Sequence, residues 1–442
     1  MGANVDLMVG KLSLLYWKSY FDRYTLGLFF TDEDLVITEN VKYDELDKEE
    51  TPHTEYKYST TVQKAIDRLN SAGYTLNAVK TEFELTKEYC LDYHNLLYHL
   101  GVDFEDYDCV AQERIEKYVT FRKWKNSVQK YALYGLNNSL FDFIIKNNDI
   151  PDGIKPKTEC DKIVFHSLTD YNSESFFGCL YSAFNPLYTI RLILECIDRN
   201  KEVCVYLNEI LDWSYDSIDD LKIGEPTEKT IVLVEGTSDK EILEFSLKNI
   251  YPHLYNLYYF MDFEYAKDKR RQGGIDAISN NLKTFITSKL KARFIAIFDN
   301  DTIGVHAKKK LEYDIITLPE NCRILNYPSI KFAKKYPTIA VSGKKVFDDI
   351  NGKACSIELY LPDNLLKSAD NEFFPITWES RVQCKLGEEQ LIGYQGKITE
   401  KELIKKSFVK YKIAVNNKKE KFNVDEWAKM KELLDTIITA FD

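Results

Sequence analysis

The sequence predicts two parts: a mostly helical region that begins with a small β element, and then a doubly wound α/β domain with a mainly parallel sheet. Apolar residues recur at helical spacing through much of 61–222, whereas strand-like runs alternate with helical ones after residue 226. Gly224 and Pro226 break the pattern between the two parts. We therefore place the β element at 1–60, the helical domain at 61–222, the α/β domain at 226–345, and an extension with a terminal helix at 346–442.

Length and charge exclude some classes of protein. The chain has 442 residues, of which 44% are apolar, as expected for a globular protein of two or three domains. Its net charge of −11 argues against a generally basic surface that coats nucleic acid. An acidic protein can still hold phosphates through a local basic surface, so an enzyme that acts on nucleic acid stays possible.

The cysteines carry no metal-binding pattern. There are nine, and none forms a C-x-x-C pair, which argues against a zinc ribbon. Unpatterned cysteines without a secretory leader fit a reducing, cytoplasmic location. The apolar run at 12–16 is far too short to cross a bilayer, so we expect no membrane role.

The elements of the first half follow from local periodicity. Strand-like runs at 25–30 and 35–38 flank an acidic turn, which predicts a hairpin. Apolar residues at helical spacing predict helices within 61–147, and helical character resumes over 175–211. A polar stretch with Pro151 separates these two helical regions.

The second half alternates strand and helix, as in a doubly wound sheet. Short apolar runs predict buried strands, and the segments between them have helical spacing. The expected strands are 230–234, 257–261 and 293–298, and the expected helices are 240–248, 275–290 and 424–441.

Carboxylates follow two of these strands. Glu235 comes directly after the strand 230–234, and Asp299 and Asp301 come directly after 293–298. Parallel strands deliver their carboxyl ends to one edge of a sheet, where ligand sites lie. Mg²⁺ and Mn²⁺ prefer such oxygen ligands, so we predict a site for one or two divalent ions there. The alternative is surface carboxylates that cap helices, with Asp239 as an N-cap.

The same residues carry a family resemblance. The string from Val234 to Asp239 resembles the first motif of the Toprim domain, and Asp299-Asn300-Asp301 resembles its Asp-x-Asp motif. Ser356-Ile357-Glu358 resembles the acidic segment of OLD-family nucleases. That resemblance implies two metal ions, the second held by Glu358 together with Asp239. The alternative for Glu358 is a first-turn glutamate favoured by the helix dipole.

Over most of its length the chain resembles bacterial HEPN/Toprim-associated proteins, on strings such as Arg271-Gln272-Gly273-Gly274 and Tyr394-Gln395-Gly396-Lys397. This resemblance implies a helical, HEPN-like N-terminal domain and a role in anti-phage defence. The R-x4–6-H motif of HEPN ribonucleases does not occur in the helical region, so we expect that domain to act as a scaffold, to bind substrate or to form homo-oligomers. The chain has no P-loop either, so any ATPase must be a separate partner.

Basic residues near the carboxylates are candidates for holding phosphate. Lys269, Arg270 and Arg271 lie between the two carboxylate-bearing strands, and Lys308 is expected to begin the helix after Asp301. The resemblance to OLD enzymes implies that a lysine of the tail approaches the scissile phosphate, and Lys401 is our first choice. The alternative for most of these residues is a solvated helix face.

We therefore predict a Mg²⁺- or Mn²⁺-dependent nuclease, with catalytic residues Glu235, Asp299, Asp301, Glu358 and Lys401. The alternative is a non-catalytic nucleic-acid-binding or adaptor subunit of a defence complex. The sequence leaves several choices open: DNA or RNA as substrate, endo- or exonuclease action, the trigger, the oligomeric state and a separate sensor partner.

Overall fold

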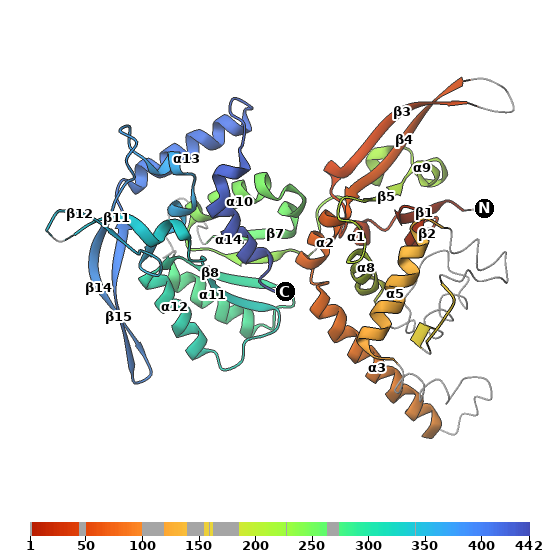
Figure 1. Ribbon diagram of the computed structural model, residues 1–442, viewed down its shortest axis with the longest axis horizontal. Helices are drawn as coiled ribbons and strands as arrows, with labels where there is room; N and C mark the ends of the chain where they lie inside the picture. Colours follow the sequence, from red (N-terminus) through yellow and green to blue (C-terminus); the bar gives the residue numbers. More distant parts are fainter. Residues whose placement is uncertain are drawn as a thin grey trace. The chain divides into compact units, whose positions relative to one another are not determined.

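The computed structural model describes residues 2–43, 50–99, 119–138, 154–158, 160–161, 185–226, 228–262, 274–340 and 342–442. The chain divides into two compact units, Met1–Thr227 and Glu228–Phe441 (Figure 1). The buried apolar residues of the first unit form one core, and those of the second unit form two.

The first unit contains a five-stranded antiparallel sheet in the order β2-β1-β5-β4-β3. In β1 the residues Val5, Leu7 and Val9 are buried and alternate with more exposed ones, as expected for a strand with one face on a core. The strands are β1 Asn4–Val9, β2 Leu12–Lys18, β3 Leu35–Tyr43, β4 Glu50–Thr61 and β5 Glu202–Tyr206.

Two predictions for this unit are wrong. The segment 25–30 does not form a strand: α1 (Arg23–Leu26) occupies its start, because the Asp22 carboxylate caps that helix by accepting the Thr25 N–H at 3.2 Å. The partner of β3 is β4 instead. The helix expected over 175–211 is also interrupted, because β5 pairs with both β1 and β4. The β element is therefore not confined to the first sixty residues.

The helices of this unit pack their apolar faces on the core, as the periodicity predicts. Thr61 caps α2 by accepting the Lys64 N–H at 3.3 Å. Parts of the predicted helical region, including 100–118, 139–153 and 162–184, lie outside the described residues. The described helices are α2 Val62–Ser71, α3 Leu76–His99, α5 Phe121–Gly135, α8 Pro186–Leu194 and α9 Asn208–Ser214, with the 3-10 turns η1 Asp32–Asp34 and η2 Ile218–Leu221.

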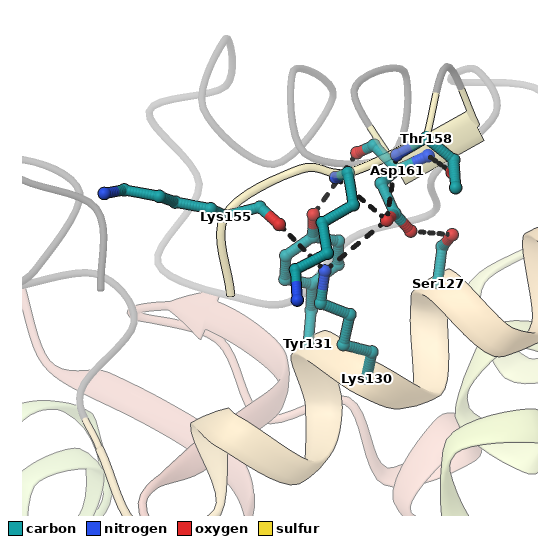
Figure 2. Close-up of polar contacts among 7 residues, drawn as sticks. Ser127, Lys130, Tyr131, Lys155, Thr158 and Asp161 are labelled. Atoms are coloured by element: carbon teal, nitrogen blue, oxygen red, sulfur yellow. Dashed lines mark hydrogen bonds and ion pairs between the residues drawn. The ribbon is translucent and has the colours of Figure 1, made fainter. Parts of the chain in front are cut away.

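A buried carboxylate attaches residues 154–158 and 160–161 to α5 (Figure 2). The Ser127 hydroxyl donates to Asp161 Oδ1 at 2.6 Å, and Lys130 Nζ lies 3.5 Å from Asp161 Oδ2. The backbone N–H of Thr158 donates to the same Oδ2 at 3.3 Å. Burial raises the pKa of Asp161, but these hydrogen bonds and Lys130 outweigh it, so the pKa lies below its usual value. Both oxygens of Asp161 have partners, so this acid stabilises the fold.

The second unit is built on a four-stranded sheet in the order β10-β8-β6-β7. All three pairings are parallel, which confirms the predicted parallel sheet. Its strands are β6 Thr230–Leu233, β7 Tyr258–Met261, β8 Phe294–Phe298 and β10 Cys322–Asn326. The main helices are α10 Thr237–Ile250, α11 Ile275–Thr287, α12 Thr302–Asp314, α13 Lys401–Asn416 and α14 Ala428–Ile438.

Helices cover both faces of this sheet (Figure 1). Successive residues of a strand point to opposite faces, so β6 and β8 each contribute to both cores. Val232 and Ile295 pack in the core that includes residues of α10, α13 and α14. Leu233 and Ala296 pack in the other core, with residues of α11 and α12.

Part of the C-terminal extension, together with residues 336–339 and 345 before it, forms a second sheet in the order β12-β11-β14-β15. The Cβ of an alanine at Gly393 would lie 2.5 Å from Thr302 Cγ2, so β15 closely approaches the start of α12. The strands of this second sheet are β11 Tyr336–Ile339, β12 Lys345–Asp348, β14 Ile376–Leu386 and β15 Glu389–Ile398. A separate two-stranded sheet pairs β13 Ala354–Cys355 with β9 Asn300–Asp301. The 3-10 turns are η3 Pro252–Leu257, η4 Lys331–Lys335, η5 Ile357–Tyr360, η6 Asp363–Leu366 and η7 Val424–Trp427.

Candidate active site

The order of the parallel strands creates a position for a ligand. From β6 the chain passes to β7 on one side, and then to β8 on the other side of β6. Connections therefore leave β6 and β8 in opposite directions, and ligands of open α/β sheets bind beyond the carboxyl ends of strands at such a point. Glu235 follows β6 and Asp299 follows β8, so both acids lie at this point.

The structure brings Glu235 and Asp299 together. Glu235 Oε1 accepts a hydrogen bond from the backbone N–H of Asp299 at 3.3 Å. On the next strand, the Asn326 side chain donates to the Asp299 carbonyl oxygen at 3.0 Å. Asp299 is thus held between β6 and β10, and its carboxylate is almost fully buried.

Asp239 lies on α10, beside the same strand end. It is the third residue of the helix, and Gly236 with extended backbone is the N-cap, so the expectation that Asp239 is the N-cap is wrong. A carboxylate in the first turn is stabilised by the helix dipole. Only 9% of Asp239 is exposed, however, and isolated buried carboxylates are rare. The helix dipole alone therefore does not explain why this acid is buried.

The carboxylates repel one another. Burial, with Asp301 and Asp239 adding to it, raises the pKa of Glu235 to about 7. Burial and the Glu358 carboxylate raise the pKa of Asp239 to about 7. Burial raises the pKa of Asp299 well above its usual value, and Glu235 and Asp239 raise it further. A site that disfavours its own negative charge is stabilised by a proton or a cation.

Asp301 is placed differently. Its Oδ1 accepts the Gly304 N–H at 2.7 Å and so caps α12, while its Oδ2 accepts from Gln395 Nε2 at 2.6 Å. Gln395 Oε1 in turn accepts the Ile303 N–H at 3.2 Å. Both oxygens of Asp301 are therefore engaged in the protein. Gln395 was not predicted as a site residue, because its contact to Asp301 spans 94 positions of sequence and leaves no local pattern.

Glu358 and Lys401 form an ion pair from the C-terminal extension. Glu358 lies in η5 and is fully buried, and its Oε2 is 3.1 Å from Lys401 Nζ and accepts the Ser356 hydroxyl at 2.7 Å. Burial lowers the pKa of Lys401, but Glu358, Asp299 and Asp239 outweigh this effect, so the pKa lies above its usual value. Lys401 is thus a cation within electrostatic range of three acids of the site.

The carboxylate oxygens of the site suit a divalent cation, although the side chains do not surround one position as a complete set of ligands. Asp299 Oδ1 and Glu358 Oε1 are buried and have no hydrogen-bond partner among the described residues. Oxygens left free in this way are suited to Mg²⁺ or Mn²⁺. Within the described ranges, however, no three His, Cys, Asp or Glu side chains are placed to hold a metal together. A cation held by three of these acids would therefore require their side chains to move.

The predicted phosphate-binding residues are only partly located. Lys269, Arg270 and Arg271 lie outside the described residues. Lys308 does not begin a helix as expected: α12 starts at Thr302, and Lys308 Nζ lies 3.6 Å from Glu312 in a surface pair.

The fold is thus a mixed α/β architecture with a parallel sheet that carries clustered carboxylates. The sequence profile of the HEPN/Toprim N-terminal domain 1 matches residues 1–229, which is half of the chain, and the protein belongs to this HEPN/Toprim-associated family. No curated protein and no solved structure matches the chain. Across the described parts of the chain, no helix is both long and apolar enough to cross a membrane. The carboxylate site begins at Glu235, beyond the matched residues.

Proposed function

We propose that the second unit is a Toprim-type phosphodiesterase, similar to those of OLD-family nucleases, that cleaves or nicks nucleic acid with Mg²⁺ or Mn²⁺. One observation carries the proposal: Glu235 and Asp299 come from the ends of adjacent parallel strands and are joined by a 3.3 Å hydrogen bond at the point where the chain reverses its direction along the sheet. Buried acids that raise one another's pKa support a cation as the natural occupant.

The residues take separate roles in this proposal. One or two bound metal ions would supply Lewis-acid polarisation of the scissile phosphate. Glu235, Asp299 and Asp301 would hold the first ion, and Asp239 with Glu358 would hold the second. Glu235 is also proposed to assist the attacking nucleophile by accepting a proton from it.

Cationic side chains hold the substrate in place. Lys401 keeps its proton in this site, so its ammonium group can attract a non-bridging oxygen of the scissile phosphate. Lys269, Arg270, Arg271 and Lys308 are proposed to bind neighbouring phosphates. DNA and RNA have the same phosphodiester group, so these contacts do not choose between them.

The first unit is proposed to act as a scaffold, through which the protein forms homo-oligomers or binds substrate. The proposed setting is bacterial anti-phage defence, with a separate ATPase or sensor as the partner that controls cleavage. Both proposals rest on the family, whose matched domain is the first unit.

A cleavage assay tests the proposed activity. The purified full-length protein is incubated with Mn²⁺ and with plasmid, linear duplex, single-stranded DNA or total RNA. We expect cleavage of at least one substrate, its loss in EDTA, and its loss in Asp299→Asn. The matched control is Asp314→Asn, since Asp314 pairs with Lys283 at 3.1 Å on the surface and should not affect cleavage. Cleavage that persists in Asp299→Asn would show that another site or a contaminant is responsible.

A second candidate is a nucleic-acid-binding adaptor that does not cut. The observation in its favour is that Asp301 is fully engaged by the Gly304 N–H and by Gln395. The two candidates differ in one result: an adaptor binds nucleic acid equally well with Mn²⁺ and with EDTA, and it leaves every substrate intact.

A further inference from the structure

A buried tyrosine lies beside the carboxylate site and has no assigned role. Tyr327 directly follows β10, and its backbone N–H donates to the Phe298 carbonyl oxygen at 2.9 Å, which extends the β10–β8 pairing to the residue before Asp299. Its ring packs edge-on against Tyr360, with centroids 5.5 Å apart. The backbone and the ring of Tyr327 are therefore both held in place.

The hydroxyl of Tyr327 is the unexplained part. Only 2% of the residue is exposed, and within the described structure the hydroxyl has no hydrogen-bond partner. Buried hydroxyl groups nearly always have a hydrogen-bond partner, so a buried hydroxyl without one needs an explanation. The neighbouring Tyr360 follows the rule, since its hydroxyl donates to the Pro328 carbonyl oxygen at 2.6 Å.

The surroundings of this hydroxyl point to the carboxylates as its missing acceptors. Burial raises the pKa of Tyr327 well above its usual value, and the charges of Asp239, Asp299 and Glu235 raise it further. The hydroxyl therefore stays protonated and lies within electrostatic range of all three acids. One of them, Asp299, has a buried oxygen, Oδ1, that likewise has no hydrogen-bond partner in the described part of the chain.

We propose that Tyr327 is a positioning residue of the metal site, whose hydroxyl donates to the Asp299 carboxylate when a divalent cation draws the acids together. This inference rests on the proposed function. Groups that hydrogen-bond to metal ligands fix the orientation of those ligands and strengthen metal binding. Tyr327 acts through Asp299, so its first effect is on the affinity for the metal.

The test is calorimetric titration of Mn²⁺ into the full-length protein, without any nucleic acid. Tyr327→Phe removes one hydroxyl and keeps the ring. We expect it to weaken Mn²⁺ binding by about tenfold or more, the range usual for loss of such a partner. Without metal its melting temperature should equal or exceed that of the wild type, because no hydrogen bond is lost.

Tyr336→Phe is the matched control. Tyr336 is equally buried, but its hydroxyl already donates to the Phe374 carbonyl oxygen at 3.0 Å. This variant should melt at a lower temperature without metal and bind Mn²⁺ as the wild type does. The opposite responses separate a role in metal binding from a role in packing.

The outcomes are distinguishable. Equal Mn²⁺ affinity of Tyr327→Phe and wild type would overturn the role of Tyr327 and leave the proposed function standing. A metal-free melting temperature of Tyr327→Phe as low as that of Tyr336→Phe would overturn it as well, because the hydroxyl would then have a structural partner. Absence of Mn²⁺ binding by the wild type would overturn the metal site and this inference together.

Discussion

Replacing Glu235 by glutamine should make the metal-free protein more stable at alkaline pH. The change removes the ionisable group. It keeps a side-chain oxygen that can accept the hydrogen bond which the Asp299 N–H donates to Glu235 at 3.3 Å in the wild type. The pKa of Glu235 is raised in the folded state, so its contribution to stability is complete below the unfolded value of 4.5 and is lost as the pH rises through about 7. A glutamine side chain does not ionise, so the variant does not lose stability in this way as the pH rises.

The magnitude follows from the pKa. A rise from 4.5 to about 7, at about 1.4 kcal/mol for each pH unit, corresponds to at most about 3 kcal/mol. For a unit of this size, ~2–4 °C in melting temperature accompanies each kcal/mol. The difference between Glu235→Gln and wild type should therefore be close to zero at pH 4, grow from pH 5 to pH 7, and reach up to about 6–12 °C at pH 8.

The assay is thermal unfolding in EDTA across this pH range, by circular dichroism or calorimetry. Glu402→Gln is the control, because the Glu402 side chain is 81% exposed on α13 and the change should follow the wild type at every pH. A Glu235→Gln protein that is no more stable than the wild type at pH 8 would refute the claim that burial and the neighbouring carboxylates disfavour the charge on Glu235. Addition of Mn²⁺ should reverse the order, because the wild type has the better ligand.

Two further changes test how the site is built. Gly304→Ala should destabilise the second unit by about 1–3 kcal/mol in urea unfolding, because the new Cβ would lie 2.3 Å from the Asp299 carbonyl oxygen; unchanged stability would contradict this close approach. Lys401→Met should cost about 3–5 kcal/mol, because it leaves the buried Glu358 carboxylate without a counter-ion. The double variant with Glu358→Gln should recover most of that loss, and a double variant as unstable as Lys401→Met alone would show that the pair does not interact.

Local sequence was sufficient for the strands and the acids that follow them. A buried strand is a short apolar run, and a residue directly after it must lie at the strand end, so the positions of Glu235 and Asp299 could be inferred from pattern alone. The N-terminal β element was misjudged for the opposite reason. β5 belongs to its sheet through pairing with β1 and β4, and such distant pairing leaves no periodic signal.

The supporting residues of the site could not be found by the same reasoning. Gln395 lies on β15, 94 positions from Asp301 in the sequence. The sequence alone does not show whether a single glutamine in a strand is exposed or contacts a buried acid. Tyr327 is one of 30 tyrosines, and only its burial next to the acids separates it from the rest. Asp301 caps α12, as in the alternative of helix-capping carboxylates, whereas the Asp-x-Asp motif favours a metal ligand.

The most direct test of the whole account is an anomalous diffraction measurement on crystals grown with Mn²⁺. We propose that Glu235 and Asp299, which follow β6 and β8, bind the same cation. We expect a manganese peak in ligand contact with both Glu235 and Asp299, and no such peak in Asp299→Asn. A wild-type map without manganese at these two side chains, or with manganese elsewhere only, would contradict it.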